Sequence, residues 1–287
     1  MDAAFGSKKW RSQRPLSAVG IAAERLKEPN LSAEFSMSPE QKRALHLLNS
    51  ASSSVALGWR EGVALALDSP GEWMAYDGTI KKLVQLVNER LGGSSKLPKL
   101  DWHLIRAMLW TETGAKHPQW RTKPMQIGVV GDAGMGVVLA GAENVGLVAD
   151  AELRANLSAE TVRHQPEANI RAGLIYLLNR MCEAKSFEEA DGAVSEHQVQ
   201  KGETFDRIGK QVGCSAQWLL KLNGQNARLA VGQVVKVQAT RRGRRITAWK
   251  AFTPENLQDR YNGNGDERYA KKLRYCLGVM EIMELAP

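Results

Sequence analysis

The sequence predicts a mainly α-helical protein that is interrupted by one small unit of strand, helix, helix and strand. Apolar residues recur at helical spacing over 77–91, 102–113, 167–181 and 267–285, which predicts four long helices. Residues 198–239 break this pattern with two short strand-like segments that flank two capped helical segments. The chain has 287 residues, 43% of them hydrophobic, so it can form one medium domain and smaller pieces. We therefore expect a helical domain with an inserted βααβ module.

The N-terminal third is expected to begin as an arm and to continue as helices. Residues 1–37 mix charged residues, serine and proline without a sustained period, which predicts a flexible or wrapped arm. A helix is expected after Ser38, because serine can cap it, a proline follows and Gln41 stands three residues on. The Gly-Gly-Ser-Ser break at 92–95 predicts a boundary between a helical region, 38–96, and the rest of the chain.

The middle of the chain is expected to hold a buried helix that ends in an acidic residue. Apolar residues cover most of the surface of the helix predicted over 102–113, and Glu112 lies at its end. A glycine-rich loop is expected from 128 to 136. The Asn-Gly-Asn-Gly turn at 262–265 precedes the last helix.

The inserted module carries its own start and stop signals. A short strand is expected from Val199, and Thr204 and Ser215 are expected to cap the two helices. Residues 232–237 alternate as a strand does. The basic run at 241–245 is expected to be a polar exit from the module.

Positive charge is concentrated in one part of the sequence. The formal charge of the chain is +8, and residues 198–250 contain eleven Lys or Arg against Glu203 and Asp206, a net charge of +9. Such a segment predicts an anionic partner, which is a nucleic acid, a lipid surface or a cell-envelope polymer. A merely solvated basic face is the alternative.

Cysteine spacing and hydropathy limit the remaining classes. Cys182, Cys214 and Cys276 form neither a metal-ligand spacing nor an even disulfide set, so buried or free thiols are expected, with no metal and no cofactor. No apolar run approaches the ~18 residues of a membrane-spanning helix. The start, 1–14, is polar and basic, so neither a transmembrane segment nor a secretory signal is expected.

Glu112 is the candidate acid for cleaving a glycosidic bond. That reaction needs a carboxyl group that donates a proton to the leaving oxygen. Glu112 follows an unusually apolar helix, which would desolvate the carboxyl and favour its protonated form. Taken alone, a glutamate at a helix end is more often a structural or solvated residue.

Four segments in the same order resemble the soluble lytic transglycosylase and goose-type lysozyme family. They are Thr111–Thr113 (Thr-Glu-Thr), Pro124–Gly128 (Pro-Met-Gln-Ile-Gly), Asn169–Leu177 and Tyr261–Gly265 (Tyr-Asn-Gly-Asn-Gly). The resemblance implies a lysozyme-like fold of the α+β superfamily. Its catalytic domain would be discontinuous, with a first part at 97–197 and a second at 240–287.

The same resemblance implies roles for particular residues. Glu112 would act as general acid and then general base, and Tyr261 would help to hold the developing charge. Gln126 and Asn262 would contact N-acetyl or hydroxyl groups of the sugar. The other implied substrate-binding residues of this domain are Thr113 and Met125. For Met125 a place in the wall or core is the alternative, and for Asn169 a role in helix packing.

The module at 198–239 resembles a LysM domain, a family that binds chains containing N-acetylglucosamine. The residues that carry the resemblance include Val199, Gly202-Glu203-Thr204, Leu222-Asn223 and Val231-Gly232-Gln233, with Glu203 in place of the usual aspartate. The resemblance implies two glycan-binding loops. Their implied contact residues are Gly202, Glu203, Thr204 and Phe205 in the first loop, and Arg228 and Leu229, continuing to Val231, in the second.

The chemistry of cleavage is left open between two reactions. An inverting muramidase needs a second carboxylate about 6.5–9.5 Å from the acid to hold a water, whereas a lytic transglycosylase uses the 6-hydroxyl of the muramoyl residue. Asp132 is the nearest candidate for the second carboxylate, and a turn-forming role is its alternative. A non-catalytic protein that binds peptidoglycan is a further possibility. Nucleic-acid binding is not expected, because 241–245 lacks interleaved aromatic residues.

A cell-wall enzyme without a secretory signal implies an unusual route. Such an enzyme would be made in the cytoplasm and delivered to a bacterial periplasm by a non-classical route. By similarity to such proteins, the routes are phage lysis, a phage-tail-like structure, or a contact-dependent system of the type VI kind that delivers an antibacterial toxin. Residues 38–96 would then dock on a secretion-apparatus component, and an immunity protein would inhibit the enzyme in the producing cell.

Overall fold

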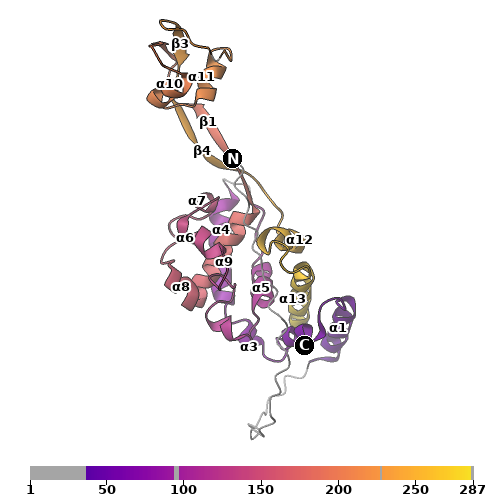
Figure 1. The fold of residues 1–287 in the computed structure, drawn as a ribbon. Coiled ribbons are helices and arrows are strands. Elements are labelled where there is room, and N and C mark those ends of the chain that lie inside the picture. The colour runs from indigo at the N-terminus through magenta and orange to yellow at the C-terminus, as the bar shows by residue number, and fades with distance from the viewer. Residues whose placement is uncertain (1–36, 94–96, 227, 286–287) are drawn as a thin grey trace. The chain divides into compact units, whose positions relative to one another are not determined.

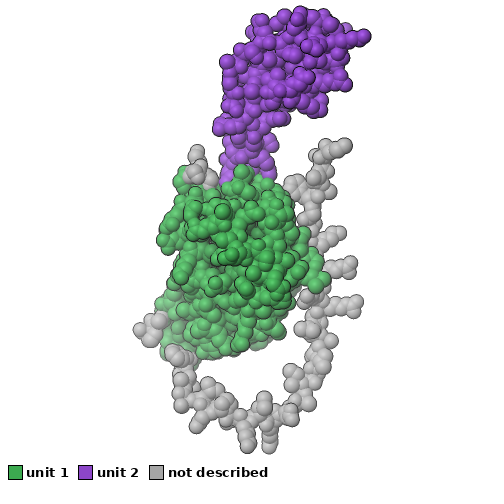
Figure 2. Space-filling view, turned by 90° about the vertical axis from the view of Figure 1, so that its left-hand side faces the viewer, with its two compact units in different colours: residues 1–183, 248–287 green, residues 184–247 purple. Residues whose placement is uncertain are grey.

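The computed structural model describes residues 37–93, 97–226 and 228–285 (Figure 1). It divides into two compact units, coloured separately in Figure 2. Unit 1 comprises the chain up to Glu183 together with the part from Ala248 onward, and unit 2 is Ala184–Thr247. Apart from Met37, the arm predicted over 1–37 lies outside the described residues.

Unit 1 is built from helices and short helical turns. Before the inserted unit these are α1 (Pro39–Ala51), α2 (Leu57–Ala64), α3 (Pro70–Trp73), α4 (Asp77–Gly92), α5 (Trp102–Glu112), η1 (Pro118–Arg121), α6 (Gly134–Ala140), α7 (Val145–Val148), α8 (Ala159–His164) and α9 (Pro166–Met181). After it come α12 (Pro254–Asn256), the π-helical turn η2 (Leu257–Tyr261) and α13 (Tyr269–Glu284). The four predicted long helices are therefore confirmed as α4, α5, α9 and α13. The glycine-rich loop is shorter than predicted, because α6 begins at Gly134.

Local signals explain where these helices begin. Ser38 caps α1 as predicted: its side chain accepts from the Gln41 N–H, and the Gln41 side chain accepts from the Ser38 N–H, which is a capping box. Asp101 caps α5 by accepting from the backbone of His103. These caps satisfy backbone donors that the first helical turn leaves without helical partners.

The core of unit 1 forms around α5 and α9. The side chains of α5 from Leu104 to Trp110 are all buried, and the helix packs against α4 and α13. Helix α9 is buried along nearly its whole length and contacts α6, α7 and α8. The predicted burial of the helix before Glu112 is thus confirmed. In the described residues no helix is long and apolar enough to span a membrane.

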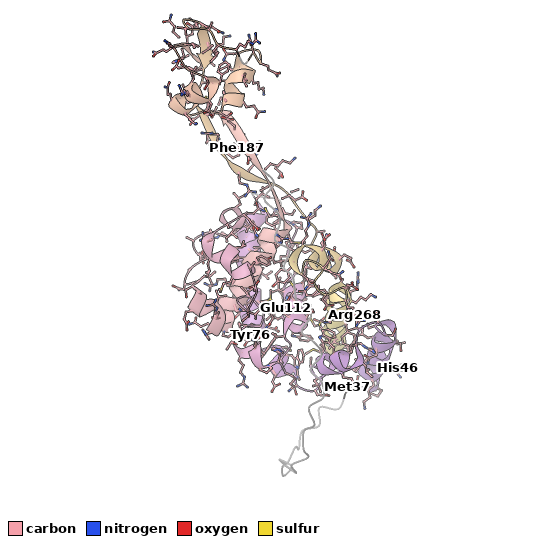
Figure 3. The ribbon with its side chains drawn as sticks, in the orientation of Figure 1. Met37, His46, Tyr76, Glu112, Phe187 and Arg268 are labelled. Atoms are coloured by element: carbon pink, nitrogen blue, oxygen red, sulfur yellow. The ribbon has the colours of Figure 1, made fainter. Side chains whose placement is uncertain are left out.

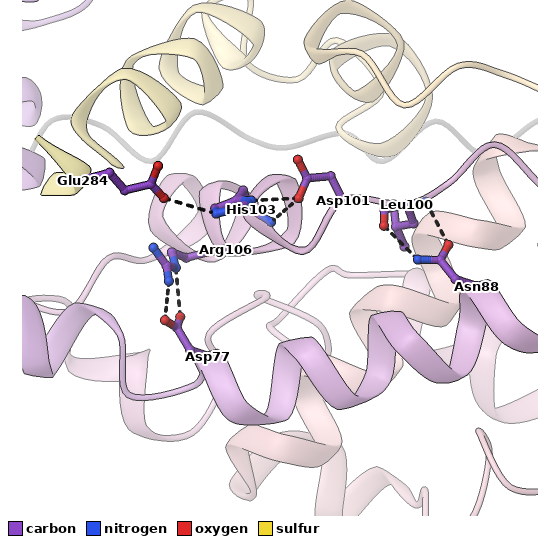
Figure 4. Close-up of polar contacts among 7 residues, drawn as sticks. All are labelled: Asp77, Asn88, Leu100, Asp101, His103, Arg106 and Glu284. Atoms are coloured by element: carbon purple, nitrogen blue, oxygen red, sulfur yellow. Dashed lines mark hydrogen bonds and ion pairs between the residues drawn. The ribbon is translucent and has the colours of Figure 1, made fainter. Parts of the chain in front are cut away.

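Helix α4 is joined to α5 by polar contacts as well as by packing. Arg106 on α5 forms a two-pronged ion pair with Asp77 at the start of α4, and both side chains are nearly buried (Figure 4). Asn88 on α4 holds both the N–H and the C=O of Leu100, with N–O distances of 2.8 and 2.9 Å. Helix α1 likewise packs on α13. The boundary predicted at 92–95 therefore does not separate compact units, because tertiary contacts join the helical region 38–93 to α5 and α13.

Unit 2 contains the predicted βααβ module. Strands β2 (Ser195–Gln198) and β3 (Val234–Val237) pair antiparallel, with Ser195 opposite Val237. Between them lie α10 (Phe205–Val212) and α11 (Ala216–Leu222), capped by Thr204 and Ser215 as predicted. The first strand ends one residue before Val199, where its start was expected. The core of the module consists of Val199, Phe205, Ile208, Cys214, Leu219, Val235 and Val237.

A second pair of strands frames this module and is not predicted by the sequence. Strand β1 (Cys182–Ala190) pairs with β4 (Thr240–Trp249). The basic run 241–245, expected to be a polar exit, is therefore part of a regular strand. Most of β4 is exposed, so its sequence lacks the apolar alternation that marks a half-buried strand. We call this pair the ribbon.

The ribbon is attached to the module through the carboxylate of Glu188. This group accepts hydrogen bonds from the N–H and hydroxyl of Ser215 and from the hydroxyl of Thr240, at 2.5–2.7 Å. Burial raises the pKa of Glu188, but these hydrogen bonds outweigh burial and hold its pKa below the ordinary value. The compact unit is consequently wider, at 184–247, than the 198–239 predicted for the module. The three cysteines, in unit 1 and unit 2, are buried free thiols, as expected.

Candidate functional site

Glu112 is the last residue of α5, and its side chain is half-buried (Figure 3). Its Oε1 accepts a hydrogen bond of 2.8 Å from the hydroxyl of Tyr269, at the start of α13. Because α5 and α13 pack along each other, this bond lies between two fixed helices. The carboxyl group is therefore held in one orientation, as a catalytic acid must be.

Three tyrosines form a buried cluster beside this carboxyl group. The ring of Tyr261 lies 5.6 Å from that of Tyr176 in an edge-on arrangement and 6.5 Å from that of Tyr269. The Tyr261 hydroxyl donates to the Met125 carbonyl at 3.4 Å.

Burial and neighbouring carboxylates keep these phenols neutral. Burial raises the pKa of Tyr261 well above its ordinary value, and the negative charges of Glu112 and Asp132 raise it further. Burial likewise raises the pKa of Tyr269 well above its ordinary value, followed by the charge of Glu112. Both hydroxyl groups therefore remain protonated near neutral pH.

Asp132 closes the loop that leads into α6. One of its carboxylate oxygens accepts from the N–H of Gly128 at 2.7 Å and the other from the N–H of Gly134 at 2.8 Å. These are the local bonds of a turn-forming aspartate, which is the alternative role considered for it.

The Pro-Met-Gln-Ile segment is packed into the protein. Met125 and Ile127 are fully buried, so Met125 has the core position that was its alternative role. Gln126 is 8% exposed, and its amide donates to the Gln119 side chain at 2.9 Å and to the Lys123 carbonyl at 3.0 Å. These bonds hold the segment in shape. Contact of Gln126 with a sugar stays a prediction.

Asn169, on α9, forms hydrogen bonds to the backbone of the Pro124–Gly128 segment. Its Oδ1 accepts from the N–H of Met125 at 2.9 Å, and its amide donates to the carbonyls of Ile127 and Val162, both at 2.8 Å. The side chain is fully buried and uses both amide hydrogens. Asn169 therefore has the packing role considered for it.

Thr113 and Asn262 are also held by the protein itself. The Thr113 hydroxyl lies 3.1 Å from the Pro124 carbonyl and 3.2 Å from that of Leu109. Asn262 is 4% exposed, and its Oδ1 accepts from the N–H of Asp266 at 2.8 Å. Both residues thus shape loops around Glu112, and their contact with substrate stays a prediction.

Sequence reasoning missed Tyr269, which contacts Glu112 directly. The residue lies in the predicted last helix, but a single tyrosine on a helix with a buried face is usually a core residue. The available signal was weak: Tyr269 begins an apolar stripe with Leu273 and Cys276 that faces α5. Only the packing of α13 on α5 brings its hydroxyl to the carboxylate.

Aromatic residues of the N-terminal helices pack against the loop that follows Glu112. The ring of Trp73 lies against Gly114, and its carbonyl accepts from the Trp110 indole at 3.0 Å. Tyr76 donates to the Trp120 carbonyl at 2.9 Å. The helical region 38–93 is thus part of the support for the candidate site. It is not only an appendage for docking.

A hollow of about 740 Å³ lies elsewhere, between α4 and the start of α5. It is lined by both polar and apolar residues, which include Lys81, His103, Leu100 and Trp102. The rise of an α-helix places it roughly 15 Å along α5 from Glu112. In the described residues no group of three or more potential ligands is arranged to hold a metal ion.

The two predicted glycan-binding loops of unit 2 lie side by side. Val199 accepts from the N–H of Gly232 at 2.7 Å and donates its own N–H to the Gln233 carbonyl at 2.8 Å. Gly202 has a φ of 82°, the left-handed conformation that favours glycine. These bonds fix the two loops as one surface.

The predicted contact residues in these loops differ in what they expose. Glu203 accepts from His197 and from the N–H of Gln200, both at 2.8 Å, and these bonds lower its pKa. Phe205 is buried in the core of the module, so its side chain supports the loop by packing. Glu203, which stands in place of the usual aspartate, therefore forms its hydrogen bonds within the module.

The second loop exposes more of its side chains. Arg228 is exposed, whereas Leu229 packs partly against the core. Val231 is 70% exposed, although it is apolar. An exposed valine suits the apolar face of a sugar ring, and its contact with a glycan stays a prediction.

Comparison with known proteins identifies one domain. The family model of the LysM domain matches residues 197–238. No curated protein and no solved structure matches the chain. The chain therefore contains a LysM domain, which binds peptidoglycan, within unit 2.

Proposed function

We propose that unit 1 cleaves the glycan strands of peptidoglycan between N-acetylmuramic acid and N-acetylglucosamine, with Glu112 as general acid and base. The observation that carries this proposal is the hydrogen bond from the buried Tyr269 to Glu112, beside the cluster of Tyr176, Tyr261 and Tyr269. The LysM domain supports the choice of polymer, since it binds the same substrate.

Different residues would contribute to different steps of bond cleavage. Glu112 donates a proton to the glycosidic oxygen, the bond from that oxygen to the anomeric carbon breaks, and positive charge develops on the sugar ring. Tyr269 donates its hydroxyl hydrogen to Oε1 of Glu112 and so orients the carboxyl group for the proton transfer. The neutral phenols exclude water and supply dipoles at fixed positions. Glu112 then accepts a proton from the attacking hydroxyl or water.

The attacking group distinguishes two forms of the reaction. A muramidase places a water on the sugar, and Asp132 is the candidate group that would hold it. A lytic transglycosylase uses the substrate's own 6-hydroxyl and forms a 1,6-anhydro end. The turn-forming bonds of Asp132 to Gly128 and Gly134 favour this second form, because they give the residue a structural role.

The LysM domain would raise the local concentration of substrate. A second binding site on the same chain converts encounters with a polymer into intramolecular ones, which strengthens binding without a new contact at the catalytic site. Removing the domain should therefore reduce turnover of insoluble sacculi more than turnover of short soluble fragments.

The test is mass spectrometry of the fragments released from purified sacculi by the wild-type protein and by Glu112→Gln. Glu160→Gln, an exposed glutamate on α8, is the matched control. Wild type and control should release fragments and Glu112→Gln should not. Reducing ends identify a muramidase, and anhydro ends identify a transglycosylase. Equal release by all three proteins would remove Glu112 from the mechanism.

A second candidate function is binding of the cell wall without cleavage. The LysM match favours it, because that match alone accounts for affinity toward peptidoglycan. The same assay separates the two, since a binding protein would sediment with sacculi and release no glycan fragments.

A further inference from the structure

The first turn of α13 determines where the hydroxyl group of Tyr269 lies. Tyr269 is the first residue of this helix, and its hydroxyl donates to Oε1 of Glu112 at 2.8 Å. Its ring is 3% exposed, so the side chain is fixed by packing and its hydroxyl moves with the backbone. An O–H···O bond is favourable over a range of only about 0.5 Å. The placement of this helix start is therefore part of the candidate site.

The residue that precedes α13 does not cap the helix. Arg268 stands at this position (Figure 3), and an arginine side chain has no acceptor for the N–H groups of the first turn. The N–H of Tyr269 donates instead to the carbonyl of Asp266 at 3.0 Å. The N–H of Ala270 donates to the side-chain oxygen of Gln258 at 3.0 Å. A residue from the preceding helical turn thus supplies the missing cap.

Gln258 is itself anchored in the protein. It lies on η2, where its neighbours Leu257 and Tyr261 are buried. Its carbonyl accepts from the N–H of Asn264 at 3.0 Å. The bond to Ala270 therefore joins the turn that carries Tyr261 to the helix that carries Tyr269.

We propose that Gln258 is a positioning residue for Glu112, because it holds the start of α13 where Tyr269 can donate to the carboxylate. The connection runs from the Gln258 oxygen to the N–H of Ala270, and from the first turn of α13 through the Tyr269 hydroxyl to Glu112. The effect on cleavage rests on the proposed function. The effect on the bond from Tyr269 to Glu112 can be measured without cleavage.

Three variants separate positioning from a general loss of stability. Gln258→Leu removes the acceptor and nearly keeps the size, whereas Gln258→Glu keeps an acceptor and adds a negative charge that a helix start favours. The matched control is Gln41→Leu. Gln41 belongs to the capping box of α1, and its amide donates to the carbonyl of Ile282 near the other end of α13. By the rise of a helix, this bond lies roughly 20 Å from Tyr269.

The first measurement is the rate of cleavage of short soluble glycan fragments. We expect Gln258→Leu to lower kcat about tenfold with KM within about threefold, and Gln258→Glu and Gln41→Leu to stay within about threefold of the wild type. In a Tyr269→Phe background, Gln258→Leu should lower kcat less than about twofold further, because the bond it positions is already absent. An unchanged kcat, an equal loss in both backgrounds, or an equal loss in Gln258→Glu or Gln41→Leu would overturn the proposal.

The second measurement is carbon NMR of the full chain labelled at the glutamate carboxyl groups. The Glu112 resonance is assigned by its absence from Glu112→Gln, and Tyr269→Phe gives its position without the hydrogen bond. Gln258→Leu should move the resonance most of the way to that position, and Gln258→Glu and Gln41→Leu should leave it in place. A resonance that Gln258→Leu does not move would overturn the proposal, whether or not the protein cleaves glycan. A resonance that moves as expected, in a protein that releases no fragments, would remove the proposed function and still support the placement of Tyr269 by Gln258.

Discussion

Replacing Asn169 by alanine should destabilise unit 1 strongly, because this one side chain satisfies three buried backbone groups. The change leaves the N–H of Met125 and the carbonyls of Ile127 and Val162 without their partner. Each buried group left unsatisfied costs about 1–3 kcal/mol. Because water can enter the small cavity and relieve part of this cost, we expect a loss of about 3–5 kcal/mol in the free energy of unfolding.

Denaturant unfolding followed by tryptophan fluorescence measures this loss. The signal reports mainly on unit 1, since residues 184–247 contain a single tryptophan, Trp218. The control is Gln85→Ala, which removes only a bond to Glu89 on the exposed surface of α4 and should cost less than about 0.5 kcal/mol. A loss below about 1 kcal/mol for Asn169→Ala would show that the three bonds are not a stabilising unit.

Three further predictions concern single residues. Tyr269→Phe removes the hydrogen bond to Glu112 and should lower the rate of glycan release about 10- to 100-fold, measured on sacculi, with little change in thermal stability. Gly209→Ala should lower the melting temperature of unit 2, since an added Cβ would lie 2.7 Å from the backbone oxygen of Cys214. The folded-state pKa of Glu188 lies below 4.5, so its contribution to stability is present above about pH 4.5 and is lost as pH falls through the folded value. Thermal melts between about pH 3 and 7 should show this loss in the wild type and a smaller one in Glu188→Gln.

The helices could be predicted where apolar spacing and capping residues agree. Ser38, Thr204 and Ser215 each cap a helix as predicted. Such a cap is a local signal, because the side-chain oxygen accepts from a backbone N–H only three residues later. Strands β1 and β4 could not be predicted in this way. Their side chains are mostly polar and exposed, and each strand is stabilised by its partner more than 50 residues away.

The candidate site could be predicted only in part, for the same reason. Glu112 stands out because a buried helix precedes it, and this burial is a local pattern. Tyr269 does not, because its role depends on the packing of α13 against α5. Met125 is the opposite case. Its motif resembles a substrate-binding segment, but packing buries its side chain in the core.

Charge shows most clearly how a linear count departs from the folded protein. Residues 198–250 carry +9, but the structural unit 184–247 carries +5, because it adds four acids that precede residue 198, Glu188, Glu189, Asp191 and Glu196, while Lys185 replaces Lys250 in the count. The count along the chain cannot include these acids, since they precede the module in sequence. The pairing of two strands determines which positive charges retain a close counter-charge.

The same pairing explains how a small domain can interrupt a helical one. The ends of the module are adjacent, since Ser195 pairs with Val237. An antiparallel ribbon can therefore carry the chain out and back with both strands hydrogen-bonded. At the base of the insertion, the N–H of Lys250 donates to the Met181 carbonyl at 2.9 Å, which brings the end of α9 next to the returning chain. Unit 1 thus needs only a short closure at this point, and its helical core can pack without a contribution from the LysM domain.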